Sequence, residues 1–183
     1  MKQSSYQDYF HFLGAVFTKV QSNLGPTSIY PLLQNNLDKL DENLVLVLQA
    51  LARDILGKLT LEEAHHIAAV INNFSTLICQ FPQGNKYWNV EIAITGHQTA
   101  LQVYTETAFP QNWAMTQYNL ANAYRERIKG DKAENLELAI ASYKAALRVY
   151  TETAFPQAWA MTKIIWLLLI AIESKETRQR IWN

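Results

Sequence analysis

Apolar and polar residues along this chain recur mostly with the period of an amphipathic α-helix, and no stretch competes with the strict alternation of a β-strand. The spacing of Thr60 and Glu63 matches a capping box, in which hydroxyl and carboxylate bind the free amide donors of a helix start. A helix is therefore expected over 61–81. Earlier helices are expected near 5–22, near 28–36 and over 41–57, with a break at Gly25-Pro26. The sequence predicts an all-α fold.

The chain repeats itself at an offset of 46 residues. Residues 100–116 read ALQVYTETAFPQNWAMT and residues 146–162 read ALRVYTETAFPQAWAMT. A second shift by 46 aligns 67–101 with 113–147, and identical residues recur along it, among them Asn73 with Asn119 and Gly84 with Gly130. A fixed period of this length is typical of repeat architectures, so a third, diverged copy is present.

Each copy contains two helical stretches joined by a glycine-containing turn, and Phe-Pro steps separate the copies. Pro110 and Pro156 are expected to open helices and Pro82 to follow the end of one, because proline suits a first turn and disfavours helix in the residue before it. We expect an N-terminal helical cap over 1–58 and repeats over 59–183. The repeats are expected at about 61–107, at 110–153, and as a lone final helix at 156–173.

The second copy resembles the tetratricopeptide repeat, in which small residues let two helices approach and large ones fill the gap. The residues that carry the resemblance are Leu120, Ala121, Tyr124, Ala139, Tyr143 and Ala146. Its NLANAYRER and AFPQNWAMT runs are similar to those of cyanobacterial tetratricopeptide proteins that often carry a C-terminal CHAT peptidase-like domain, although no such domain occurs in this chain. The resemblance implies a right-handed helix-turn-helix solenoid with additional N-terminal helices, a protein-binding function and no catalytic residue.

Composition excludes several functions. Lys plus Arg and Asp plus Glu both number 16, so no net charge attracts nucleic acid or an anionic membrane. The single cysteine, Cys79, cannot form an internal disulfide, and the N-terminus lacks the pattern of a secretory signal. A cytoplasmic location is expected.

The candidate chemistry is weak. His65 and His66 are neighbours on a helix and diverge by roughly 100°, so they cannot chelate one metal together. His97 stands where the second copy has Tyr143, a position expected to pack between helices. Cys79 with a histidine could form a nucleophile-base pair, but no motif surrounds it. We expect no catalytic residue, no metal site and no cofactor.

Polar residues on the first helix of each copy form the candidate binding surface, because stacked repeats turn this helix towards a concave face. The candidates are Asn72, Asn73, Thr76, Tyr118, Asn119, Asn122 and Arg125. An asparagine amide can hold the backbone of an extended peptide, and arginine can pair with a carboxylate. The alternative is that these asparagines bond neighbouring helix ends and keep the surface soluble.

The final helix differs from its counterpart, because KIIWLLLIAIE at 163–173 replaces QYNLANAYRER at 117–127. A helix without a polar side is expected to be covered all round. A homodimer interface through Ile164, Ile165, Leu168 and Ile172 is the favoured explanation. Cover within the chain and membrane contact are the alternatives, although the apolar run is shorter than the roughly 20 residues of a span.

The sequence thus predicts a non-catalytic scaffold or adaptor that binds a protein segment in a concave helical groove. The alternative is a regulatory module, or a remnant of a CHAT-type peptidase-associated protein.

Overall fold

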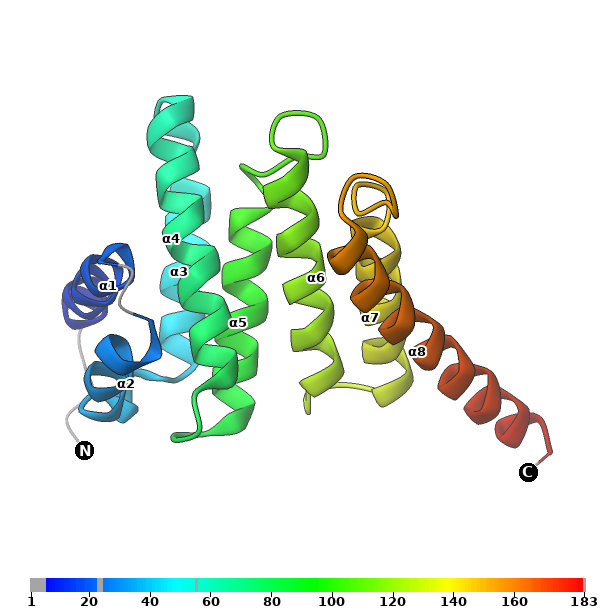
Figure 1. Ribbon diagram of the computed structural model, residues 1–183. Helices are drawn as coiled ribbons and strands as arrows, with labels where there is room; N and C mark the ends of the chain where they lie inside the picture. The colour runs from blue at the N-terminus through cyan, green and yellow to red at the C-terminus, as the bar shows by residue number, and fades with distance from the viewer. Residues whose placement is uncertain (1–5, 23–24, 55, 183) are drawn as a thin grey trace. The chain divides into compact units, whose positions relative to one another are not determined.

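The computed structural model describes residues 6–22, 25–54 and 56–182, with side chains described as far as Ser174. Every regular element in these residues is helical, which confirms the all-α class. The α-helices are α1 (Tyr6–Gln21), α2 (Pro26–Gln34), α3 (Glu42–Asp54), α4 (Leu61–Gln80), α5 (Lys86–Ala100), α6 (Pro110–Glu126), α7 (Lys132–Ala146) and α8 (Pro156–Trp182) (Figure 1). The chain divides into two compact units, Met1–Val103 and Tyr104–Asn183.

The helix boundaries follow local chemistry. Glu63 donates its backbone N–H to Thr60 Oγ1 over 3.3 Å, and Thr60 donates its own to Glu63 Oε2 over 2.9 Å, which confirms the capping box at α4. Pro110 and Pro156 open α6 and α8 as predicted. Other boundaries differ from the predicted ones: α2 spans Pro26–Gln34 rather than 28–36, α3 ends at Asp54 rather than at 57, and α8 continues beyond residue 173.

In the first unit, α4 and α5 form a helix pair, α1 packs against α4, and α3 packs against α5. The buried side chains include Val16 of α1, Leu48 of α3, Phe74 of α4 and Ile92 of α5, all without solvent exposure. The N-terminal helices therefore share one core with the first helix pair. The expected boundary at residue 58 lies inside this unit.

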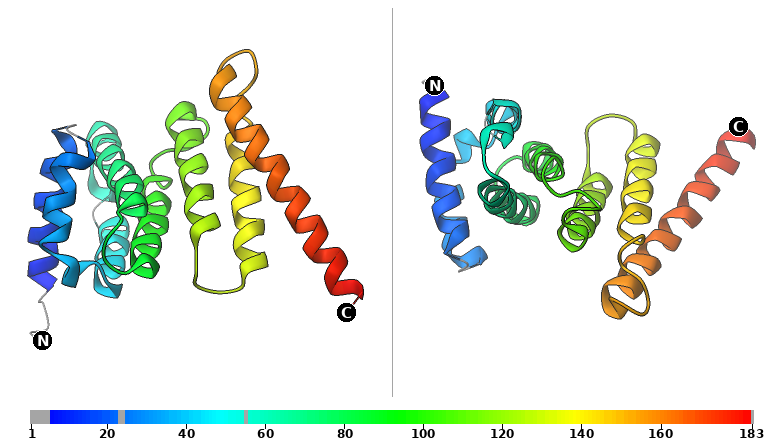
Figure 2. Two further views of the ribbon diagram at one scale, coloured as in Figure 1. Left: turned by 60° about the horizontal axis from the view of Figure 1, so that its bottom comes forward. Right: turned by 90° about the horizontal axis from the view of Figure 1, so that it is seen from above.

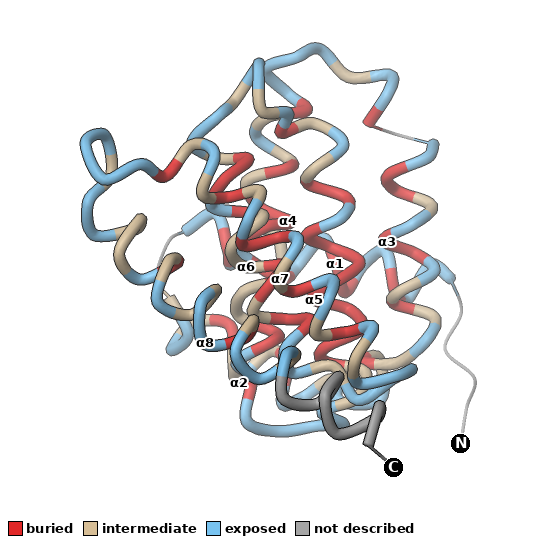
Figure 3. Tube along the Cα trace, turned by 90° about the vertical axis from the view of Figure 1, so that its right-hand side faces the viewer, coloured by how far each residue is buried: buried red, intermediate tan, exposed pale blue. Residues whose placement is uncertain are grey.

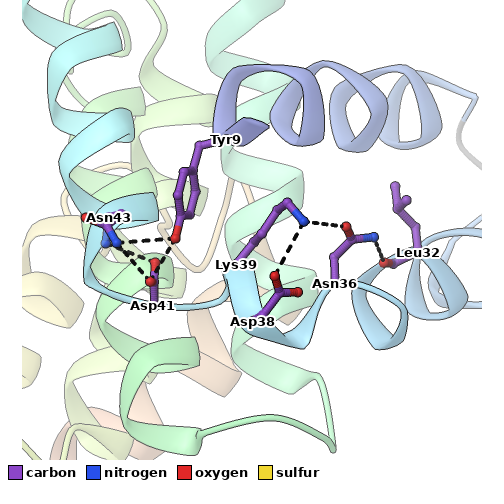
Figure 4. A network of polar contacts seen from close by, with 7 residues as sticks. All are labelled: Tyr9, Leu32, Asn36, Asp38, Lys39, Asp41 and Asn43. Atoms are coloured by element: carbon purple, nitrogen blue, oxygen red, sulfur yellow. Dashed lines mark hydrogen bonds and ion pairs between the residues drawn. The ribbon is translucent and has the colours of Figure 1, made fainter. Parts of the chain in front are cut away.

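A polar network joins α1 to the start of α3 (Figure 4). Tyr9 donates its hydroxyl to Asp41 Oδ2 over 2.8 Å, and Asp41 Oδ1 accepts the backbone N–H of Asn43 and of Leu44 at the first turn of α3. Burial, with the hydrogen bond to Asp41 adding to it, raises the pKa of Tyr9 to about 12. The hydroxyl therefore stays a donor at neutral pH.

In the second unit, α6 and α7 form the corresponding pair and α8 packs against α7. Figure 2 shows α8 crossing α7 near its first turns and then diverging from it. Among the side chains of α8 described as far as Ser174, Leu169 and Thr162 are buried, whereas the others are exposed or half-buried (Figure 3). Helix α8 is thus only partly buried within the second unit.

The 46-residue repeat recurs in local geometry. Gly84 and Gly130 both have a positive φ, 78° and 79°, which suits glycine at the turn within each pair. An asparagine side chain hydrogen-bonds the backbone of the turn in both pairs. Asn89 Nδ2 donates to the carbonyl of Gln83, and Asn135 Nδ2 donates to the carbonyl of Lys129, each over 2.8 Å. The sequence repeat is therefore also a structural one.

The two YTETAFP loops are also alike. Thr105 Oγ1 accepts the N–H of Ala108 over 3.1 Å, and Thr151 Oγ1 accepts that of Ala154 over 3.2 Å. In both loops the tyrosine ring packs edge-on against the phenylalanine, with centroids 5.7 and 5.6 Å apart. The two loops therefore have the same internal hydrogen bonds, and each leads directly into the next helix.

Candidate functional site

The middle of the second helix in each pair carries one large polar side chain, His97 on α5 and Tyr143 on α7. These residues are 46 positions apart and are 1% and 0% exposed. Each hydrogen-bonds the side-chain oxygen of an asparagine on the preceding helix, His97 to Asn72 and Tyr143 to Asn122. The predicted packing of His97 between helices is confirmed.

The site around His97 is closed. His97 Nδ1 lies 2.8 Å from Asn72 Oδ1, and Asn72 is 1% exposed. Burial lowers the pKa of His97 to about 3, so the ring is neutral at physiological pH and donates from Nδ1 to the amide oxygen. Asn72 therefore does not lie on a surface that a partner could reach, contrary to the expectation that it lies on the binding face.

The other two candidates on α4 are more accessible. Asn73 is exposed, and Thr76 is half-buried and donates its hydroxyl to the backbone carbonyl of Asn72 over 3.1 Å. The first unit therefore presents Asn73 fully, and Thr76 in part, at its surface.

The site around Tyr143 is open on one side. Tyr143 donates its hydroxyl to Asn122 Oδ1 over 2.7 Å, and the Tyr118 ring packs against the Tyr143 ring with centroids 5.6 Å apart. Arg125 donates from Nη1 to Asn122 Oδ1 over 3.3 Å and to the Tyr143 hydroxyl over 3.4 Å. We call Tyr118, Asn122, Arg125 and Tyr143 the Tyr143 cluster. Three of the predicted residues meet in it, and Asn119 lies beside it on α6, half-buried.

The members of the Tyr143 cluster differ in exposure. Tyr143 is buried, Tyr118 and Asn122 are half-buried, and Arg125 is exposed. Burial raises the pKa of Tyr143, while the neighbouring Arg125 acts in the opposite direction, so the hydroxyl remains protonated and holds Asn122. The cluster therefore combines a buried tyrosine, Tyr143, with a positively charged side chain, Arg125, at the surface.

Hydrogen-bonding capacity remains in this cluster. Both bonds to Asn122 engage its oxygen, so its amide N–H groups can donate to an incoming acceptor. Arg125 bonds neutral oxygens, and within the described part of the chain no carboxylate forms an ion pair with it. The arrangement suits an amide or carboxylate oxygen from another molecule.

The candidate nucleophile and metal ligands do not form a constellation. Cys79 is buried, and Lys86 Nζ contacts its backbone carbonyl over 3.1 Å. His66 is exposed and its Nε2 lies 3.0 Å from Gln21 Nε2. Across the residues that the structure describes, no group of three or more His, Cys, Asp or Glu side chains could hold a metal ion.

The predicted interface on α8 is largely at the surface. Ile164, Leu168 and Ile172 are 60%, 58% and 44% exposed, whereas Ile165 is half-buried. Sequence reasoning missed Met161 and Leu167, which are exposed to a similar extent, because an all-apolar helix does not reveal which side its neighbour covers. Within the described residues the chain therefore covers only one side of α8, through α7.

The helix is longer than its apolar run. The stretch Pro156–Ser174 is, by length and composition alone, apolar enough to cross a membrane, with a mean hydropathy of 1.2, and 11% of it is buried. A core helix of a soluble protein passes the same test of length and composition. The unbroken apolar run within it, 164–172, is still shorter than the roughly 20 residues of a span, so membrane contact stays an untested alternative.

Comparisons of the chain with protein-family models, with curated proteins and with solved structures gave no match. Fold and site together define an all-helical protein with an internal 46-residue repeat and one open polar cluster.

Proposed function

We propose that this protein is a non-catalytic scaffold that holds a segment of another protein, and that the Tyr143 cluster is the place where the segment binds. The observation that carries the proposal is the combination of a buried tyrosine, a half-buried asparagine and an exposed arginine joined by hydrogen bonds on α6 and α7. Fixed polar groups lose little conformational entropy on binding, which favours recognition. The proposal includes the right-handed stacking of the helix pairs that the resemblance implies.

The chemistry favours an extended segment with an acidic group. The amide of Asn122, with that of Asn119 one helical turn away, can bond backbone groups of a peptide whatever its side chains are. Arg125 can take an aspartate, a glutamate or a terminal carboxylate with two parallel hydrogen bonds. Affinity would then come from several modest contacts rather than from one deep pocket.

The test is quantitative capture. Proteins retained by the immobilised chain from native extract are identified, and the dissociation constant of the tightest is measured for the wild type and for the Asn119→Ala, Asn122→Ala variant. We expect binding to weaken by about 1–3 kcal/mol, because polar groups of the segment are left unpaired. The melting temperature should fall only slightly, because both side chains are partly solvated and Arg125 still hydrogen-bonds the Tyr143 hydroxyl.

The matched control is Gln111→Ala, which removes an exposed amide from the first turn of the same helix, outside the cluster. It should bind like the wild type. The proposal is wrong if the double variant binds like the control. It is equally wrong if binding and stability fall together, because the asparagines would then be structural.

A further inference from the structure

Helix α8 begins like α6 and then changes character. Thr162 Oγ1 donates to the carbonyl of Ala158 over 2.6 Å, as Thr116 Oγ1 does to that of Asn112 over 2.8 Å. Helix α8 is therefore the first helix of a further copy of the repeat. No second helix lies against it in the described residues in the way that α7 lies against α6.

On α6, one face is covered by α7. The equivalent face of α8 consists of the residues 46 positions later in the sequence. Tyr143 of α7 contacts Tyr118, Asn122 and Arg125 of α6. The corresponding residues of α8 are Ile164, Leu168 and Ala171. The polar contacts of the earlier pair are thus replaced by apolar side chains.

The side chains at and beside these positions are apolar and exposed, and most of the described part of α8 is coloured exposed or intermediate in Figure 3. We call this set of side chains the α8 face, and its residues are Met161, Ile164, Leu167, Leu168 and Ile172, which are 57%, 60%, 50%, 58% and 44% exposed. Leu169 and Thr162, which are buried, lie on the opposite side of the helix. Contiguous apolar surface of this kind marks an interaction site.

The α8 face does not fit another repeat helix of the kind seen in the earlier pairs. Their helices cross at small residues: a Cβ added to Gly96 of α5 would lie 2.0 Å from Ser75 Oγ of α4. The residue equivalent to Ser75 is Ala121 in α6 but Leu167 in α8. Leucine at the crossing keeps an approaching helix farther away than serine or alanine does, because the distance between packed helices depends on the side chains at the contact.

We propose that a second copy of this chain covers the α8 face, with the two α8 helices antiparallel and the two-fold axis at Leu168. An isologous interface requires a face that is complementary to itself under a two-fold rotation. Ile164, Leu168 and Ile172 meet this requirement. An isoleucine lies four residues before Leu168 and another four residues after it, so the order of side chains is the same in both directions. Each Ile164 then meets the Ile172 of the second copy, and the two Leu168 side chains meet on the axis.

The size of the α8 face also fits. Five side chains that are about half exposed present roughly 500 Å² on one copy, so two copies bury about 1,000 Å², the lower limit for a specific interface. An interface at this lower limit is expected to be a weak one, so the measured mass should depend on concentration.

The mass of the full chain in solution, measured by light scattering over a concentration series, tests the proposal. We expect the wild type to approach twice the protomer mass of 21.0 kDa as concentration rises. Leu168→Glu, which places two carboxylates together on the axis, should weaken dimerisation by about 100-fold or more. Ile128→Glu is the matched control, because Ile128 is 65% exposed but lies outside the α8 face, and it should leave dimerisation unchanged.

A charge exchange tests the antiparallel register. Ile164→Lys and Ile172→Glu alone should each weaken the dimer, and the double variant should recover it at least 10-fold over either, because lysine and glutamate then face each other twice. Parallel pairing would bring like charges together, so a double variant weaker than both singles contradicts the register. Circular dichroism of every variant checks that helical content is kept.

Three further results would overturn the proposal. One is a wild type that stays monomeric at every concentration and floats with phosphatidylcholine vesicles, which would assign the α8 face to a bilayer. Another is a wild type that stays monomeric and does not bind vesicles, which would leave a different protein as the occupant. Dimerisation that Leu168→Glu does not weaken would place the interface elsewhere.

Discussion

The helix pairs α4–α5 and α6–α7 belong to the same 46-residue sequence repeat, but the polar contact in the middle of each pair is buried to a different extent. In α4–α5 the central His97 bonds Asn72 and both are buried, so the polar pair belongs to the core. In α6–α7 the central Tyr143 bonds Asn122, which is half-buried, and the exposed Arg125 completes the group. One backbone arrangement thus yields a closed polar contact in one copy and a surface cluster in the other.

The two pairs also differ in the residues at their helix crossings. The α4–α5 crossing holds Gly96 against Ser75, with no room for a Cβ. The α6–α7 crossing has Ser142 at the position of Gly96 and Ala121 at that of Ser75, so a Cβ is accommodated on the second helix there. Burial of a polar pair is favourable only when its hydrogen bonds are made, and His97 with Asn72 meets that condition.

Adding a methyl group where α4 and α5 cross should have the largest effect on stability. Gly96→Ala places a methyl group 2.0 Å from Ser75 Oγ and 3.2 Å from Ser75 Cβ. The Ser75 hydroxyl is also bonded to the carbonyl of Ile71 over 2.7 Å, so it cannot move freely. We expect a loss of about 3 kcal/mol in the free energy of unfolding, measured by chemical denaturation.

The control is Gly14→Ala on α1, where nothing lies within 4 Å of the added Cβ. This change should stabilise the protein by about 0.5–1 kcal/mol through helix propensity. Adding Ser75→Ala to Gly96→Ala should restore part of the lost stability, because the closest contact is removed. Gly96→Ala with wild-type stability would show that the α4–α5 crossing has room for a methyl group, contrary to the close contact with Ser75.

Sequence patterns predicted the framework of both pairs. Pro110, Pro156 and the Thr60 capping box set helix starts through chemistry that is local in the chain, so they could be identified without a structure. The 46-residue period correctly paired Gly84 with Gly130 at the turns. Tertiary packing did not change these features.

The orientation of neighbouring residues could not be predicted. Asn72 and Asn73 differ by about 100° around α4, and the repeat offers two adjacent asparagines without indicating which faces inward. His97 decides this, because its ring reaches Asn72 across the pair. On α8 the nearly uniform apolar sequence hid the distinction between the side against α7 and the exposed α8 face.

Acid should destabilise the closed pair through His97. Burial lowers the pKa of His97 to about 3, so between pH 6.5 and pH 3 the unfolded chain binds a proton that the folded chain does not. Stability present above pH 6.5 is therefore lost as the pH falls, by about 2 kcal/mol at pH 5. Denaturation at several pH values measures the loss.

The matched variant is His97→Gln, which keeps an amide donor for Asn72 but does not titrate. The free energy of unfolding should fall less steeply between pH 7 and pH 5 in this variant than in the wild type, since the other acid-sensitive groups are common to both. Identical slopes would mean that His97 gains its proton in the folded state and that the site is more open than its burial indicates.

Removing the Tyr143 hydroxyl from the α6–α7 pair should have the smallest effect on stability. Tyr143→Phe keeps the ring against Tyr118 and removes the bonds to Asn122 and Arg125. Asn122 is half-buried and Arg125 exposed, so water replaces the lost partner and the free energy of unfolding should fall by less than about 1 kcal/mol. Affinity for the captured protein segment should fall several-fold all the same, because Asn122 is no longer held in position. A loss of stability above about 2 kcal/mol would mean that the Tyr143 hydroxyl is sealed from water as His97 is, and the contrast between an open and a closed pair would fail.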